Sequence, residues 1–193
     1  LDARAAGLAC AAILPVSLLA AYEINGSFCL ILAGYLAIQI SYCLFVKHLI
    51  ILDVFSIASG FVLRVAAGSV AIDVPMSRWL LICTIFISLF LAVAKRRHEL
   101  LLLGTGAGDH RKVLEQYSVL FLDQMISIAT AGTIVSYSLY TLSEETVAKF
   151  GTTHLWFTIP IVLYGISRYL YRVYTHHDGG QPEDLIWRDK PLL

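Results

Sequence analysis

The stretch LDVFSIASGFVLRVAAGSV, residues 52–70, places an arginine inside an otherwise apolar segment. Arg64 follows Asp53 by eleven positions, and at about 100° per residue this spacing puts both side chains on one face of a helix. The rise between them is about 16 Å, so the two charges need separate partners. A guanidinium inside a membrane segment is costly unless it is paired, and we therefore interpret Arg64 as a ligand-binding residue. An arginine that is hydrogen-bonded within a helix bundle is the structural alternative.

The helix face that carries Asp53 and Arg64 has small side chains between them, because Ser56 and Gly60 share this face and Gly68 lies near it. Such a surface admits close packing by another helix or by a ligand. A planar guanidinium binds phosphate with two parallel hydrogen bonds where water is scarce. The sequence therefore predicts a cavity for a phosphorylated ligand, with Arg64 at its bottom and these cations at its mouth: Lys47, Lys95, Arg96 and Arg97.

Two acidic residues near these cations are candidate magnesium ligands. Glu99 follows the cations in KRRHEL, and Asp109 ends GTGAGD. Glu99 alternatively orients the neighbouring cations, Asp109 alternatively caps a helix, and KRRHEL alternatively anchors the topology of the preceding segment. The glycine-rich string lacks the preceding strand and the Lys-Ser/Thr ending of a phosphate-binding loop, so we interpret it as a turn.

Asp123 and Gln124 interrupt a long apolar run at residues 113–140. We place them about three turns into a helix, where polar side chains face the bundle interior and contact a cation or a substrate. Hydrogen bonding between helices is the alternative. Glu115, Gln116 and Ser118 precede this pair, and we expect the helix to begin with them in the aqueous interface.

The composition indicates a membrane protein. The 193 residues are 58% hydrophobic and 15% charged, and the mean hydropathy is +0.75. Apolar runs near the length of a membrane span lie at residues 6–22, 28–46, 54–71, 78–94, 113–140 and 153–174. We expect one all-α, polytopic transmembrane domain over residues 1–193, with six helices and a tail at 175–193. Tyr35 fits an aromatic belt or bundle packing, and the four cysteines fit small core residues.

The basic residues orient this domain. If the N-terminus is cytoplasmic, Arg78 and Lys149 lie on the outer side, and ten basic residues lie on the cytoplasmic side: Arg4, Lys47, Lys95, Arg96, Arg97, Arg111, Lys112, Arg172, Arg188 and Lys190. This asymmetry predicts a multi-pass protein of the plasma membrane whose cavity opens to the cytoplasm. No nucleic-acid ligand is expected.

Four strings carry a resemblance to a known family: SYCLFVKHLIILDVFSIASGFVLRVAAG, AKRRHELLLL, HRKVLEQYSVLFLDQM and GGQPEDLIWRDKPL. They resemble the decaprenyl-phosphate phosphoribosyltransferase branch of the UbiA-type intramembrane prenyltransferase superfamily. The resemblance implies Mg²⁺-dependent transfer of a phosphoribosyl group from phosphoribosyl pyrophosphate to a polyprenyl phosphate, with release of diphosphate. It implies phosphate binding by the cations named above, an orienting or ribose-binding role for Asp53, and substrate contacts from Tyr42, Arg111 and Asp123.

The sequence also departs from the superfamily pattern. An aspartate-rich NDxxDxxxD motif, which holds magnesium in the superfamily, does not occur in the 193 residues. With about nine helices implied and six predicted, we expect an N-terminal part to be missing and the chain to be inactive alone. Glu99 and Asp109 fall where a second acidic motif is common. Tyr42 and Lys47 fall where YxxxK is common, with one residue more between them.

Two other functions remain open from the sequence. One is a UbiA-type prenyltransferase that acts on an aromatic or haem acceptor. The other is a membrane transporter or lipid-binding protein in which Arg64 is a counter-ion for the substrate. Inverted repeats would favour transport, and the two halves of the sequence show no convincing similarity.

Overall fold

The computed structural model describes residues 3–103, 112–176, 179–180, 189 and 191. Over these ranges the protein is helical and contains no strand. The six long helices are α1 (Ala3–Ile24), α2 (Gly26–Leu44), α3 (Leu52–Ala71), α4 (Arg78–Leu103), α6 (Val119–Leu142) and α8 (Ile159–Thr175). The shorter ones are α7 (Glu144–Phe150) and the 3-10 helices η1 (Val46–His48), η3 (Lys112–Gln116) and η4 (His154–Thr158). The predicted all-α class is confirmed, and each of the six predicted apolar runs overlaps one long helix.

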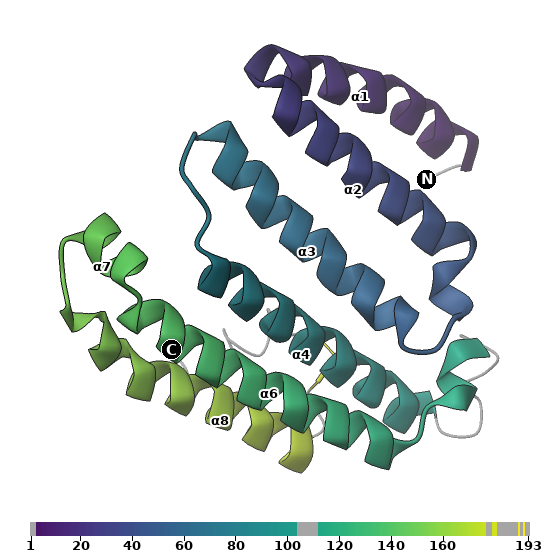
Figure 1. Ribbon diagram of the computed structural model, residues 1–193. Coiled ribbons are helices and arrows are strands. Elements are labelled where there is room, and N and C mark those ends of the chain that lie inside the picture. The colour runs from purple at the N-terminus through teal and green to yellow at the C-terminus, as the bar shows by residue number, and fades with distance from the viewer. Residues whose placement is uncertain (1–2, 104–111, 177–178, 181–188, 190, 192–193) are drawn as a thin grey trace.

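The long helices lie side by side in chain order (Figure 1). Helix α1 packs on α2, α2 on α3, α3 on α4, α4 on α6, and α6 on α8. Short connections favour antiparallel packing of consecutive helices, and this topology brings the chain back and forth through one layer. Because α4 lies between α3 and α6, side chains on its two flanks meet different partners.

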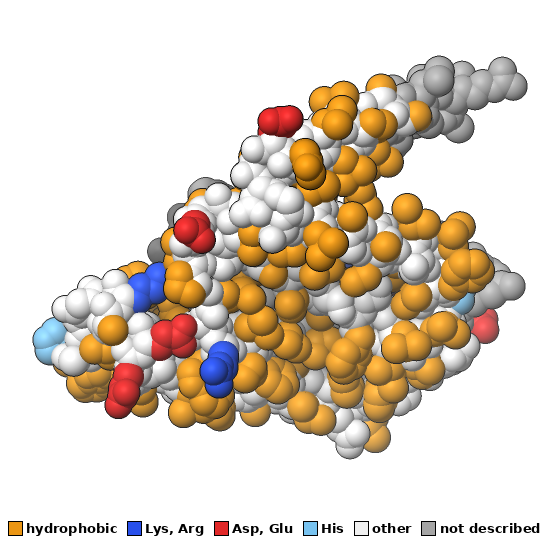
Figure 2. Space-filling model, turned by 45° about the horizontal axis from the view of Figure 1, so that its top comes forward, with side chains coloured by type: hydrophobic (Ala, Val, Ile, Leu, Met, Phe, Trp, Pro, Cys, Tyr) orange, Lys and Arg blue, Asp and Glu red, His pale blue; other side chains and the backbone are white. Residues whose placement is uncertain are grey.

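Four helices, α2, α3, α4 and α6, are long and apolar enough to cross a membrane. Figure 2 shows a face on which hydrophobic side chains predominate, with most of the charged ones on the left of the view. Large apolar side chains such as Leu30, 77% exposed, lie on the outer surface. Exposed apolar area on this scale is unfavourable in water and favourable in lipid. We therefore describe the chain as a multi-pass membrane protein.

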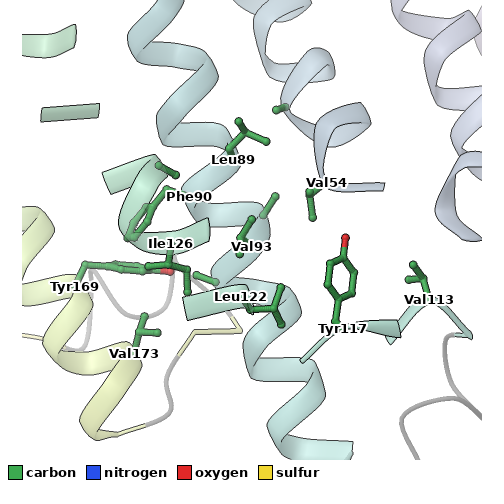
Figure 3. Close-up of a cluster of buried hydrophobic side chains, with 14 residues drawn as sticks. Val54, Leu89, Phe90, Val93, Val113, Tyr117, Leu122, Ile126, Tyr169 and Val173 are labelled. Atoms are coloured by element: carbon green, nitrogen blue, oxygen red, sulfur yellow. The ribbon is translucent and has the colours of Figure 1, made fainter. Parts of the chain in front are cut away.

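The buried core is centred on α4. Phe90 and Val93 of that helix pack with Leu122 and Ile126 of α6 and with residues of α3 and α8 (Figure 3). The rings of Phe90 and Tyr169 meet edge to face, with their centroids 5.2 Å apart. Helix α2, in contrast, contains no buried residue. The well-packed half of the molecule is therefore α3, α4, α6 and α8.

The run at residues 113–140 is not one helix, and that part of the prediction is wrong. Lys112–Gln116 form the separate helix η3, and α6 begins only at Val119. Ser118 causes the break, because its side chain accepts a hydrogen bond from the Phe121 N–H and caps the new helix. Asp123 and Gln124 consequently lie in the second turn of α6, rather than three turns deep.

Candidate functional site

A pocket of about 810 Å³ lies between α2, α3 and α4. Its walls are largely apolar, with contributions from Ile57, Phe61, Leu91 and Ala92. Polar and charged side chains from all three helices also line it: Tyr35, Gln39, Tyr42, Arg64, Ser88, Lys95, Arg96 and Glu99. The structure thus brings together five of the residues that the sequence singled out, namely Tyr42, Arg64, Lys95, Arg96 and Glu99.

Arg64 meets a phenol in this pocket. Its Nη2 donates a 2.6 Å hydrogen bond to the hydroxyl of Tyr35, and its guanidinium lies 5.2 Å from the Tyr35 ring centroid and 5.3 Å from that of Phe61. The Nε2 of Gln39, one turn from Tyr35 on α2, donates to the same hydroxyl over 3.1 Å. These partners are neutral, so they orient the guanidinium without compensating its charge.

Tyr35 is a site residue that the sequence interpretation assigned to packing. A signal was available, because Tyr35 and Gln39 are four positions apart in an apolar helix and therefore share one face. Gly60 of α3 faces this ring: a Cβ built on the glycine would lie 3.5 Å from Cε2 of Tyr35, an ordinary van der Waals contact. The face of small side chains predicted on α3 is therefore used for close helix packing beside Arg64.

Arg96 lies between two carboxylates at the other end of the pocket. Its Nε is 3.3 Å from Oδ2 of Asp53, and its Nη1 pairs with Oε2 of Glu99. Asp53 is fully buried and Arg96 is 3% exposed, whereas Glu99 keeps 26% of its side chain exposed. Lys95 is exposed and lines the same pocket. A buried carboxylate thus holds Arg96 from behind, and a partly exposed one meets it at the pocket wall.

Asp53 is fixed by a second contact, from Tyr117 in the connection between η3 and α6. The Tyr117 hydroxyl donates to Oδ1 of Asp53 over 2.7 Å and accepts a 2.7 Å hydrogen bond from the Ile51 N–H. In Figure 3 the Tyr117 hydroxyl points toward the segment that carries Val54. Burial, and after it the hydrogen bond to Asp53, raises the pKa of the Tyr117 phenol. Asp53 is absent from the pocket lining and contacts Arg96 from behind it. Its predicted orienting or ribose-binding role stays a prediction.

Ile51, which Tyr117 binds, has an unusual backbone. Its φ is 69° and its ψ is −47°, and the Leu52 N–H bonds to the Ile50 carbonyl over 2.7 Å. This is a γ-turn with positive φ, a strained conformation for a β-branched residue. The Tyr117 hydroxyl binds the N–H of this turn immediately before α3, and therefore sets where that helix begins.

Arg97 and Asp123 form a second ion pair, away from the pocket. The Arg97 Nε lies 2.6 Å from Oδ1 of Asp123, its Nη1 donates to the Val173 carbonyl over 3.4 Å, and its guanidinium is 4.5 Å from the Tyr174 ring centroid. These contacts join α4, α6 and α8. Asp123 thus bonds between helices, as the alternative expected, and its predicted contact with a substrate stays a prediction.

The remaining predicted residues are not in the pocket lining. Lys47 lies half-buried in η1, while Arg111 and Asp109 fall outside the residues that the structure describes. Part of the predicted tail packs on the bundle, where the buried Asp189 binds Arg168 over 3.1 Å and lies 3.7 Å from Arg172. Gly179 and Gly180 pack against Ala94 and His98 of α4, where an added Cβ would clash.

A magnesium site is not formed by the described part of the chain. No group of three or more His, Cys, Asp and Glu side chains gathers there, and Glu99 is engaged with Arg96. Hard divalent cations require several oxygen ligands around one point. These residues by themselves do not fit Mg²⁺, and the magnesium expected from the resemblance stays a prediction.

Comparison with known proteins gives several relatives that share one name. The chain is 31% identical over 183 residues to the decaprenyl-phosphate phosphoribosyltransferase of Mycolicibacterium smegmatis, covering 91% of this chain and 57% of the relative. It is 31% identical to the protein of that name from Mycobacterium tuberculosis, with the same coverages. It is 34% identical over 166 residues to that of Corynebacterium glutamicum, covering 84% and 48%. No family model matches the chain.

The chain spans about half the length of the curated relatives that it matches. The match nevertheless runs through nearly all of the helices described above, including the three that line the pocket. The resemblance expected from the sequence is confirmed: over the part that it shares with them, the chain is a homologue of the proteins named decaprenyl-phosphate phosphoribosyltransferase.

Proposed function

We propose that this protein takes part in the transfer of a phosphoribosyl group from phosphoribosyl pyrophosphate to a polyprenyl phosphate, with decaprenyl phosphate as the acceptor suggested by its relatives' name. The observation that carries the proposal is the pocket between α2, α3 and α4, where Arg64 and Lys95 present positive charge inside an apolar layer. Cations in such a setting favour a phosphorylated ligand that reaches the membrane.

The proposed reaction exchanges one bond at the anomeric carbon of the ribose. The bond from that carbon to the diphosphate oxygen breaks, inorganic diphosphate leaves, and an oxygen of the lipid phosphate forms the new bond. The acceptor is already an anion at neutral pH, so no strong general base is required. Arg64 and Lys95 would stabilise the negative charge that grows on the leaving diphosphate, an electrostatic contribution that needs no protein nucleophile.

The apolar surroundings suit the lipid substrate. Helices α2 and α3, which line the pocket, also carry exposed apolar side chains such as Leu30 and Phe55. A polyprenyl tail would lie along these lipid-facing surfaces while its phosphate enters the pocket. The asymmetry of the basic residues supports a plasma-membrane location with the pocket open to the cytoplasm. Magnesium is not used in deriving these roles.

The test is a transfer assay on membranes from cells that express the open reading frame encoding this chain. Phosphoribosyl pyrophosphate labelled in the ribose and a polyprenyl phosphate are supplied with and without Mg²⁺, and label is measured in the organic phase. We expect lipid-soluble label to accumulate, and Arg64→Ala to reduce it at least a hundredfold because the transition-state charge loses a cation of the pocket lining. Arg78→Ala, an exposed arginine at the other end of α4, should leave transfer unchanged.

Two results would contradict the proposal. Transfer that persists in Arg64→Ala at the level of Arg78→Ala would remove Arg64 from the site. Absence of transfer from phosphoribosyl pyrophosphate, with consumption of a prenyl diphosphate and an aromatic or haem acceptor by the same membranes, would assign the pocket to a conventional prenyltransferase.

A further inference from the structure

Among the residues that the structure describes, the charges at the Arg96 end of the pocket cancel. Arg96 and Lys95 contribute two positive charges there, and Asp53 and Glu99 contribute two negative ones. Arg96 in particular faces two carboxylates, so its guanidinium carries no excess positive charge toward the pocket. A phosphate that approaches Arg96 therefore meets a carboxylate in the position where it would bind.

The two carboxylates differ in how firmly they are held. Asp53 is fully buried, comes from a different helix, and accepts a further hydrogen bond from Tyr117. Glu99 lies three residues from Arg96 on the same helix, is 26% exposed, and lines the pocket. Ion pairs that reach solvent contribute little net stability, because water and salt compete for both partners. Of the two carboxylates, Glu99 is therefore the one that can separate from Arg96.

We propose that Glu99 is an internal anion that occupies Arg96 while the pocket is empty and is displaced by a phosphate group of the ligand. The inference rests on the proposed function and adds a regulator of the same site. Displacement swaps one charge-assisted hydrogen bond for another on Nη1 of Arg96, while the Asp53 contact on Nε is retained. The guanidinium thus keeps its orientation in both states.

Displacement also sets a threshold that every anion must overcome. Every anion that binds Arg96 must expel Glu99 and then lie near it, which costs the same for each. A ligand with several phosphate groups compensates through Lys95 or Arg64 in the same pocket, whereas inorganic phosphate gains fewer of these contacts. Glu99 is thereby expected to keep the pocket clear of abundant small anions and to admit a diphosphate.

The test measures binding of inorganic pyrophosphate, without transfer chemistry. The purified full chain in nanodiscs of uncharged lipid is titrated with pyrophosphate and separately with inorganic phosphate by calorimetry. Glu99→Gln keeps the size and a hydrogen-bond acceptor but removes the charge, and we expect the Kd for pyrophosphate to fall about tenfold. Because expelling Glu99 costs the same for each anion, the Kd for inorganic phosphate should fall by a similar factor in this variant.

Two further variants keep the test sharp. Glu115→Gln makes the same change in net charge at an exposed position of η3 and should leave both Kd values unchanged. Glu99→Asp keeps the charge on a shorter side chain, and its Kd should lie between those of wild type and Glu99→Gln. Unchanged or weaker pyrophosphate binding by Glu99→Gln would overturn the inference, and weaker binding confined to Mg²⁺-containing buffer would identify Glu99 as a metal ligand instead.

The failure of this inference differs from that of the proposed function. If wild type binds pyrophosphate and loses it in Arg64→Gln, but Glu99→Gln binds no more tightly, only the role of Glu99 is wrong. If neither wild type nor Glu99→Gln binds pyrophosphate, both proposals are wrong.

Discussion

Arg96 and Arg97 are adjacent on α4 and pair with carboxylates of different neighbouring helices, Asp53 of α3 and Asp123 of α6. Consecutive helical residues point about 100° apart, so one arginine reaches the pocket and the other reaches the packed side of the bundle. The two arginines of one basic cluster therefore have different surroundings, one in the pocket lining and the other in contacts between helices.

Arg97→Ala should lower stability rather than remove a ligand contact. The change leaves Asp123 without its ion pair and the Val173 carbonyl without this donor, a cost of about 2 kcal/mol. Thermal unfolding in detergent measures it, with Arg78→Ala as the exposed control. An Arg97→Ala protein that melts like wild type would show that the α4, α6 and α8 contacts add no stability.

Tyr117→Phe should destabilise the junction before α3. The phenyl ring stays, but the hydroxyl that binds both Asp53 and the Ile51 N–H is lost, at a cost of about 2 kcal/mol. Tyr164→Phe, at an exposed hydroxyl of α8, is the control in the same melting experiment. Equal melting temperatures of Tyr117→Phe and Tyr164→Phe would contradict the contacts of the Tyr117 hydroxyl with Asp53 and Ile51.

The Tyr117 contribution should also depend on pH in the alkaline range. Burial raises the pKa of this phenol in the folded state, while the unfolded state titrates near the ordinary value of about 10. The stabilisation is therefore complete below about pH 10 and is lost as the pH rises toward the folded pKa. The melting difference between wild type and Tyr117→Phe should be constant from pH 7 to 9 and narrow above pH 10. A difference that already narrows below pH 9 would contradict the raised pKa.

Tyr35→Phe should weaken the Arg64 end of the pocket without unfolding the protein. The ring under the guanidinium remains, but the hydroxyl that accepts from Arg64 and Gln39 is lost. We expect kcat/KM for phosphoribosyl pyrophosphate to fall about fivefold, the worth of one hydrogen bond. Tyr22→Phe on the outer surface of α1 is the control and should leave kcat/KM unchanged. If Tyr35→Phe has the same kcat/KM as Tyr22→Phe, Tyr35 does not belong to the site.

Gly132→Ala tests the packing of α4 against α6. A Cβ at this position would lie 2.5 Å from Cδ1 of Phe86, so the ring must move, and overpacking of this kind costs about 2 kcal/mol. At Gly165 in α8 no neighbouring atom lies within 4 Å of the added Cβ, and alanine there should raise stability by about 0.5 kcal/mol through helix propensity. Melting temperatures that move in the same direction for both variants would contradict this packing.

The sequence predicted the helices well where apolar length alone determines them. It also indicated that Arg64 and Asp53 share a face, because helical spacing fixes that relation. The rotation of α4 could not be predicted, since an apolar run does not say which neighbour each flank meets, and Arg97 was therefore grouped with Arg96 at the pocket. The contact from Tyr117 to Ile51 spans 66 positions, and no local pattern encodes a partner so far along the chain. The start of α6 after Ser118 was missed because the predicted run at residues 113–140 included the polar residues before it.

The Tyr117 oxygen has a consequence for any redesign of this protein. Two connections on the same side of the layer, before α3 and before α6, meet at a single atom. Tags, labels or insertions placed next to Ile51 or Tyr117 would displace the start of α3 or α6, and through the shared hydrogen bond they would also displace the other helix. Such additions belong instead in the turn between α3 and α4, where Asp73 is exposed.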